Sequence, residues 1–424
     1  MDLAMHVHYI SFLLYNIFLI PMIFFSVIYY MAAIRSILSR DEQQEAQKKG
    51  VNWPRVTVQI PTCNEPVAIR CAKSCLQFDY PKDKVEIIIG DDSTDTLTSE
   101  SISRFAQESG GRVKVTHRGQ NNGFKAGNLN HMLKYSNGEI IVIFDSDFIA
   151  QKDFLKRIVA PFIKDPAIGC VQAEWDFMNE KTNYISKLSS TLLTFYYSLI
   201  VPINKRVGVP LLFGSGEAVR KSVIVDVGGW DENSLTEDTD FSLRVLNRGY
   251  RIDYLGDLKV FGEVPYTLKG LISQQRRWAY GNTRAFVGNI RSIIFGPLSL
   301  LQKMMITYTT YVGYVSNFVF LLFLISGFVF FFSQPQGPID VMKFVTNTTK
   351  MMLITSGFVV GGVIALHKKN KMNLASSSLI STFTVGVLVS VSVCMGFFNA
   401  VIGKQMEWSA IKKEGNVTYA LDTV

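Results

Sequence analysis

The chain has 424 residues, of which 48% are hydrophobic, and it carries a formal net charge of +8. The length is too great for one simple domain, and the hydrophobic share is too high for a wholly soluble protein. Five cysteines without a C-x-x-C pair are typical of reduced thiols. Basic residues beside the membrane and at phosphate sites account for the charge better than a nucleic-acid partner does.

Apolar runs predict an integral membrane protein. The uncharged runs Tyr9–Ile34 and Met304–Phe332 both exceed the roughly 20 residues that cross the hydrocarbon. Met351–Leu366 is short for a span, and Leu374–Gly403, rich in Ser, Gly and Val, predicts either a packed span or a broken, partly interfacial one. The first run lacks a cleavage site and predicts a retained anchor. Four runs are few for an enclosed channel, which leaves room for a homo-oligomer.

Basic residues give the orientation. Arg35, Arg40, Lys48 and Lys49 follow the first run, and basic clusters at 367–371 and 404–413 follow later ones, whereas residues 1–8 contain no Lys or Arg. The positive-inside bias therefore places residues 35–303 in the cytosol. We expect a multi-pass protein of the plasma membrane that also contacts membrane lipid.

The block that follows residue 50 alternates strands with helices, which specifies an α/β fold with a doubly wound, mostly parallel sheet. The expected strands are Arg55–Ile60, Val85–Ile89, Val113–Thr116, Ile140–Phe144 and Cys170–Glu174. A polar helix is expected before them, and four more helices alternate with or follow them: Ser39–Gly50, Val67–Phe78, Ser99–Ser109, Gly123–Lys134 and Asn183–Ile200.

Polar side chains follow three of these strands where each one ends. They are Thr62 and Glu65, Asp91 and Asp92, and Asp145 and Asp147. Ligands of open α/β sheets bind at the carboxyl ends of the strands, so convergence there favours a ligand site over ordinary turns. The D-x-D pair Asp145 and Asp147 suits Mg²⁺ or Mn²⁺ shared with phosphate oxygens. No G-x-G-x-x-G follows the first strand, and no P-loop motif occurs.

Seven short motifs occur in a characteristic order: PTCNE, DDSTD, GFKAGNLN, DSD, FGSG, TED and QQRRW. In order and spacing they resemble the inverting family-two glycosyltransferases, and most closely the membrane-embedded branch of cellulose, β-mannan, chitin and hyaluronan synthases. The resemblance covers about residues 54–280 and implies a GT-A-type domain inserted between transmembrane helices. It implies a UDP-sugar or GDP-sugar as donor and a glycan or glycolipid as acceptor.

The resemblance also assigns the donor residues. It implies that Thr62, Glu65 and Asp92 contact the base and ribose, that Asp91 supports their turn, and that Lys125 and Asn128 lie near the diphosphate. Asp145 and Asp147 would hold the metal, which neutralises charge on the departing nucleoside diphosphate. A solvated lysine at a helix start is the structural alternative for Lys125.

For the acceptor side, the family implies contacts to Phe213, Gly214, Ser215, Gly216 and Glu237. Asp238 is the expected base, because an inverting transfer needs one carboxylate to take the acceptor proton. A helix cap at Thr236 is a compatible alternative, and Asp240 is a weaker candidate. Trp175 and Trp230 are each equally suited to stacking on sugars and to core packing.

The Q-x-x-R-W segment lies in an amphipathic stretch, Leu268–Ile294, that predicts an interfacial helix. Within it we expect Gln274 and Arg277 to face the donor and Trp278 the acceptor sugar. Trp408–Lys413 (WSAIKK) resembles the gating loop of processive synthases, with Trp408 and Lys413 at its aromatic and lysine positions and Ile411 replacing the threonine. Tyr308, Tyr311, Tyr314 and Phe318 suit either a sugar path or helix packing.

Five parts follow from these patterns. They are an anchor (1–34), a cytosolic GT-A domain (35–266), an interfacial segment with Q-x-x-R-W (267–303), a C-terminal transmembrane region (304–403) and a gating-loop-like tail (404–424). The expected activity is transfer of a hexose, with inversion, to a growing β-linked polysaccharide. Transfer of one sugar to a membrane lipid (polyprenyl phosphate, ceramide or diacylglycerol) is the main alternative, and a non-enzymatic nucleotide sensor is the weaker one.

Overall fold

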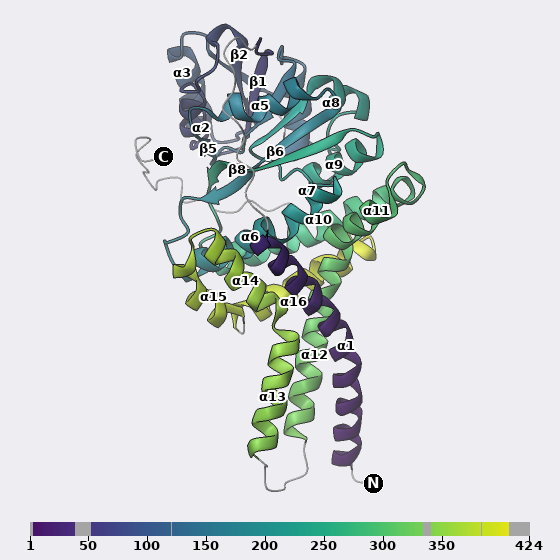
Figure 1. Cartoon of the computed structure of the whole chain (residues 1–424). Helices are drawn as coiled ribbons and strands as arrows, with labels where there is room; N and C mark the ends of the chain where they lie inside the picture. The colour runs from purple at the N-terminus through teal and green to yellow at the C-terminus, as the bar shows by residue number, and fades with distance from the viewer. Residues whose placement is uncertain (1–2, 39–51, 120, 334–340, 383, 407–424) are drawn as a thin grey trace.

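The computed structural model describes residues 3–38, 52–119, 121–333, 341–382 and 384–406. An α/β domain stands at one end of a group of long helices, and the N-terminus lies at the opposite end (Figure 1). The expected helix Ser39–Gly50 lies outside these ranges, as do Trp408 and Lys413.

The α/β domain is built on one eight-stranded sheet with the order β3-β2-β1-β4-β7-β6-β8-β5. Strands β1 to β4 pair in parallel, as the sequence predicts for a doubly wound sheet. Strand β7 runs antiparallel between β4 and β6, and β5 runs antiparallel at the far edge, so the sheet is mixed. The strands are β1 Val56–Thr62, β2 Val85–Asp91, β3 Val113–His117, β4 Ile140–Ile143, β5 Ile149–Ala150, β6 Ile168–Phe177, β7 Glu217–Arg220 and β8 Arg251–Gly262.

Helices cover both faces of the sheet, because the central strands are apolar on both sides. In β4, Ile140 and Val142 join one core while Ile141 and Ile143 join the other. The helices of this domain are α2 Ala68–Cys75, η1 Lys82–Lys84, α3 Thr96–Glu108, α4 Phe124–Leu133, α5 Phe154–Lys164, α8 Lys221–Val227 and α9 Glu237–Asn247.

A long helical segment links the sheet to the membrane region. It starts at α6 (Tyr184–Phe195), which a capping box at Asn183 begins, and continues through the π-helical turn η2 (Tyr196–Ile200) into α7 (Val201–Val207). The predicted amphipathic helix is α10 (Leu268–Phe295), and it lies between the α/β domain and the membrane-type helices (Figure 1).

Two described helical stretches are long and apolar enough to cross a membrane, Leu3–Leu38 (α1) and Leu300–Phe332, as the sequence predicts. The second consists of α11 Leu300–Thr307, η3 Tyr308–Val312 and α12 Gly313–Phe332. Two further apolar pairs are bent, and counting each as one span gives four. They consist of α13 Val341–Thr355 with α14 Gly357–Lys368, and of η4 Met372–Leu374 and α15 Ala375–Thr382 with α16 Val385–Val401.

The first bend has a local cause. The N–H of Gly357 donates to the hydroxyl of Ser26 on α1 at 2.8 Å, and a Cβ at Gly357 would lie 2.1 Å from the Ser26 carbonyl oxygen. The chain therefore leaves the α13 direction where it touches α1, at an angle of 58°. The short run Met351–Leu366 is thus two helices, and Leu374–Gly403 takes the broken form of the two that its composition predicts.

The aromatic stripe of the second span packs against other helices. Tyr311 contacts Phe286 and Phe397, and Phe318 contacts Phe398. These contacts are helix packing, which is one of the two roles that the sequence leaves open.

Candidate active site

A pocket of about 220 Å³ opens at the carboxyl ends of β1 and β4. Its remaining walls come from the start of α4, the end of β6, α6, the loop before β7, the start of α9, the end of β8 and the middle of α10. Most of the residues predicted from the sequence meet here: Thr62, Glu65, Lys125, Asn128, Asp145, Asp147, Phe213, Gly214, Glu237, Asp238, Gln274, Arg277 and Trp278. Segments more than 200 residues apart in the chain therefore form one site.

The D-x-D pair lies directly after the buried strand β4. The amide of Asp145 donates to the hydroxyl of Ser215 at 3.0 Å, which fixes the start of the turn. Asp147 is almost fully buried, and its Oδ2 accepts from the amide of Glu263 at 3.2 Å. Asp145 is thus fixed through its backbone by the loop before β7, whereas the Asp147 carboxylate itself is held at the end of β8.

Lys125 occupies the centre of the polar wall. Its ammonium lies 2.7 Å from Asp145, 3.1 Å from Glu237 and 2.6 Å from the carbonyl oxygen of Gly214. Burial favours the neutral amine, but the carboxylates of Asp145 and Glu237 outweigh it and raise the pKa of Lys125. Lys125 is therefore a partly buried, permanently charged cation rather than a solvated lysine at a helix start.

The glycine turn before β7 is shaped around this lysine. Gly214 has a φ of 84°, and a Cβ there would lie 2.9 Å from the Lys125 ammonium and 3.3 Å from Asp238 Oδ2. Ser215 and Gly216 lie behind Gly214, where both are buried and neither lines the pocket. Their contact with the acceptor stays a prediction, and their position shows them supporting the wall from inside.

Asp238 lies in the first turn of α9, where the N–H of Thr239 donates to its Oδ1 at 2.7 Å. Burial and the neighbouring Glu237 raise the pKa of Asp238 to about 7, against the lowering effect of Lys125, that amide and Arg277. A carboxylate whose pKa lies near neutrality is suited to accept a proton. Thr236 precedes the helix, but its side chain makes no capping hydrogen bond.

Asp240, the weaker candidate for the base, has other partners. Its Oδ1 accepts from Asn289 and its Oδ2 from Arg244, each at 2.8 Å, and it does not line the pocket.

Trp230 stacks on Phe241 in the core. Trp175 instead lines the pocket, and its Nε1 donates to the Ser215 carbonyl.

One arginine ties together the turn after β2 and the loop before α4. Arg118 donates to both carboxylate oxygens of Asp92 and also to the carbonyl oxygens of Asn122 and Phe124. Asp91 is buried and accepts from the amide of Ser93, which supports the turn as predicted. Neither Asp91 nor Asp92 lines the pocket, so their contact with a nucleotide stays a prediction.

Two buried side-chain amide oxygens of the pocket accept no hydrogen bond from the described residues. Asn128 donates to the Gly90 carbonyl at 2.8 Å, but its Oδ1 has no partner among the described residues. Gln274 Oε1 is likewise buried without a partner there. Polar groups of this kind are costly unless a ligand satisfies them, so both suit the hydroxyl or amino groups of a bound ligand.

The carboxylates present are suited to a divalent cation. Asp145 and Asp147 offer hard oxygens, and no group of three His, Cys, Asp or Glu residues that would enclose a metal is found among the described residues. A cation there would take further oxygens from a diphosphate, which is how Mg²⁺ usually binds. The donor set therefore fits a metal that arrives with its nucleotide.

Sequence patterns did not indicate three residues of this site. Glu217 follows the glycine turn, accepts from the amide of Gly214 at 2.9 Å, and has its pKa raised to about 8 by burial. Glu263 lines the pocket at the end of β8 and pairs with Arg70. The third is Arg118, one residue beyond β3. Glu263 and Arg118 each follow the end of a strand, and that position is the sequence signal that could have indicated them.

The fold and the site define a glycosyltransferase of the GT-A-like class. Residues 54–281, more than half of the chain, match the glycosyltransferase-like family 2, and the chain belongs to this family. This confirms the family that the seven motifs indicate.

Two plant proteins are similar over most of the chain. Glucomannan 4-beta-mannosyltransferase 7 of Arabidopsis thaliana is 26% identical over 391 residues, 88% of this chain and 67% of its own. Probable glucomannan 4-beta-mannosyltransferase 6 of Oryza sativa subsp. japonica is 27% identical over 394 residues, 86% of this chain and 64% of its own. The chain thus spans about two thirds of the length of these relatives.

Among solved structures, a mannosyltransferase from Pyrobaculum calidifontis, in complex with GDP-Man and Mn²⁺, has a similar fold. The TM-score is 0.60 at 18% identity, and the match covers 89% of this chain and 99% of that one. This similarity confirms the fold class.

Proposed function

We propose that the protein is a membrane-bound inverting glycosyltransferase that adds hexoses from a nucleoside diphospho-sugar to a growing β-linked polysaccharide. One observation carries the proposal: a carboxylate with a pKa near 7, Asp238, shares a pocket with the D-x-D pair and with Arg277 and Trp278. The pocket therefore combines a proton acceptor, groups for a diphosphate and an aromatic platform for a sugar.

The reaction is a single displacement. The acceptor hydroxyl oxygen forms a bond to the anomeric carbon as the bond from that carbon to the diphosphate oxygen breaks, and configuration inverts. Asp238 takes the hydroxyl proton, while Lys125 and Arg277 stabilise negative charge on the departing nucleoside diphosphate. A divalent cation, Mn²⁺ or Mg²⁺, held by Asp145 and Asp147, would supply further charge neutralisation to the leaving group.

The choice of sugar follows from the relatives. Both plant relatives are named as glucomannan mannosyltransferases, and the structural neighbour was solved with GDP-mannose. GDP-mannose is therefore the first donor to test. These names also favour a polysaccharide acceptor over a lipid. We place the α/β domain on the cytosolic side of the plasma membrane, where nucleotide sugars are made, and this agrees with the basic residues that follow α1 and α14.

The test is an assay of membranes that contain the full chain, with labelled GDP-mannose and, in parallel, other GDP- and UDP-sugars. A high-mass product that β-mannanase degrades supports the proposal. Label that enters only the organic-soluble fraction would mean lipid transfer, and nucleotide binding without turnover would mean a sensor. Asp238→Asn membranes are the matched control, because the same protein is present without its base.

A further inference from the structure

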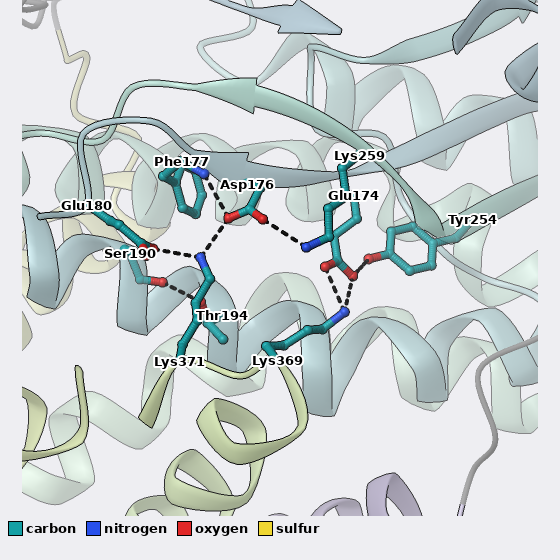
Figure 2. Close-up of polar contacts among 10 residues, drawn as sticks. All are labelled: Glu174, Asp176, Phe177, Glu180, Ser190, Thr194, Tyr254, Lys259, Lys369 and Lys371. Carbon is teal, nitrogen blue, oxygen red and sulfur yellow. Dashed lines mark hydrogen bonds and ion pairs between the residues drawn. The ribbon is translucent and has the colours of Figure 1, made fainter. Parts of the chain in front are cut away.

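A cluster of six charged side chains joins the membrane region to the α/β domain. The turn between α14 and α15 carries Lys369 and Lys371, whose ammonium groups contact carboxylates of β6 and of the loop that follows it (Figure 2). Lys369 lies 2.7 Å from both carboxylate oxygens of Glu174. Lys371 lies 2.6 Å from Asp176 and 2.7 Å from Glu180.

The cluster is balanced in charge and largely buried. Its three carboxylates face three ammonium groups, the third being Lys259 on β8, which lies 2.8 Å from Asp176. The side chains of Glu174 and Lys371 are only 5% and 13% exposed. Burial alone raises the pKa of Asp176, but Lys371 and Lys259 outweigh it and lower the pKa to about 2. Burial alone would also lower the pKa of Lys371, but Asp176 and Glu180 outweigh it and raise that pKa. The largely buried pair of Lys371 and Asp176 therefore stays charged and is poorly screened by salt.

The same carboxylates connect to the aromatic side of the pocket. The hydroxyl of Tyr254 donates to Glu174 at 2.8 Å, and the Tyr254 ring contacts Phe213, which lines the pocket. Lys371 lies 5.8 Å from the ring centre of Phe177, another lining residue. Trp175, also in the lining, stands between Glu174 and Asp176 in β6.

Helix α6 is bound into the same cluster. Ser190 of α6 lies beside Glu180 (Figure 2), and its hydroxyl donates to that carboxylate at 3.0 Å. Leu193, one turn further along α6, lines the pocket. The turn between α14 and α15 thus holds β6, β8 and α6 together at the aromatic end of the pocket. Lys125 and Asp145 have partners of their own outside this cluster: Lys125 pairs with Asp145 and Glu237, and the amide of Asp145 donates to Ser215.

We propose that Lys369 and Lys371 are positioning residues that fix the acceptor side of the active site from the membrane region. This rests on the proposed function, because it assigns the aromatic end of the pocket to the acceptor glycan. Without Lys369, Glu174 loses its ammonium partner and keeps only the hydroxyl of Tyr254. Without Lys371, one of the two ammonium groups beside Asp176 is lost, and β6 with its aromatic neighbours can then shift. The donor side keeps its own contacts through Arg118 and Lys125.

The experiment compares Lys369→Met and Lys371→Met in the full chain, reconstituted in lipid nanodiscs. Three quantities are measured: the KM for an added β-linked manno-oligosaccharide, the rate of GDP-mannose hydrolysis by water, and the Kd for GDP. We expect the oligosaccharide KM to rise about fivefold or more, while hydrolysis and GDP binding change less than about twofold. The conservative variants Lys369→Arg and Lys371→Arg should return the KM to near the wild-type value.

Lys114→Met is the matched control, because its pair with Glu86 lies on the outer strand β3 and is 48% exposed at the lysine. An exposed pair contributes little, so every measured quantity should stay at the wild-type value. If the methionine variants do not fold, Tyr254→Phe removes only the hydroxyl between Glu174 and the aromatic wall, and it should raise the oligosaccharide KM in the same direction.

An oligosaccharide KM within about twofold of wild type in these variants would overturn the inference, as would an equal loss of GDP binding. A wild-type protein that transfers no sugar from any nucleotide sugar would instead overturn the proposed function. The two failures are therefore distinguishable, because the first requires an active wild-type enzyme.

Discussion

Replacing Asp238 by Asn tests the assignment of the base. Asparagine has nearly the size of aspartate, but its amide cannot accept a proton near neutral pH. General-base catalysis contributes about 10²–10⁴-fold, so we expect transfer to fall by at least about 10². GDP should bind with an unchanged Kd, because the base acts on the acceptor and contributes mainly in the transition state.

The pH dependence gives a second, independent magnitude. A base must be ionised to act, and the pKa of Asp238 is raised to about 7 in the free protein. The kcat/KM for transfer should therefore rise about tenfold per pH unit below pH 7 and level off above it.

The thermal stability of Asp238→Asn shows whether the variant is correctly folded. Because the pKa of Asp238 in the folded protein lies above its unfolded value, folding binds a proton between about pH 4 and 7. The stability contributed by this group is therefore greatest in acid and is lost as the pH rises through 7. Asp238→Asn removes that buried charge, so at pH 8 the variant should melt no lower than wild type.

Two results would refute this reasoning. Transfer by Asp238→Asn at a rate close to wild type would assign the base elsewhere, with Glu237 next because it lines the same pocket. Asp240 is the less suitable substitute, since both of its oxygens already accept hydrogen bonds. A large loss of GDP affinity would instead show that Asp238 acts on the donor.

Three further predictions concern the metal and two glycines. EDTA should stop transfer and Mn²⁺ or Mg²⁺ restore it, and Asp147→Asn should lower the rate by about 10² or more; full activity in chelator would contradict both. Gly214→Ala should reduce transfer and weaken GDP binding, because its Cβ would lie 2.9 Å from the buried lysine and its φ of 84° disfavours alanine. Gly396→Ala should lower the melting temperature, since its Cβ would lie 2.3 Å from a carbonyl oxygen of α10, whereas Gly288→Ala meets open space and should not.

Local patterns predict the half of the site whose residues follow simple strands. The runs that form β1, β2 and β4 are rich in β-branched residues, so their ends, with Thr62, Asp91 and Asp145, can be placed from sequence alone. Strand β8 was not predicted. A bulge breaks its pairing with β6 between Ala173 and Glu174, which shifts the apolar alternation along the strand. Glu263 at its end was missed for the same reason.

The part of the structure that local patterns do not predict depends on partners that are distant in sequence. The cluster at residues 367–371 predicts a basic turn that faces anionic lipid, yet Lys369 and Lys371 pair with carboxylates of β6 and its following loop. No local pattern reports this contact, since the partners lie about 190 residues earlier in the chain. The motif FGSG likewise indicates a turn, but its burial behind Lys125 depends on how α4 and β7 pack.

Helix α10 explains why this α/β domain is joined to membrane helices. Its middle turns carry Gln274, Arg277 and Trp278 into the pocket, and the same turns meet α16 at Gly396 with almost no space between the two backbones. The hydroxyl of Ser392 on α16 also donates to the α10 backbone at 3.2 Å. A displacement of α16 therefore moves the side chains that complete the pocket. This side of the pocket is thus built on contacts with membrane-type helices, which supports the proposed growth of a product at the membrane surface.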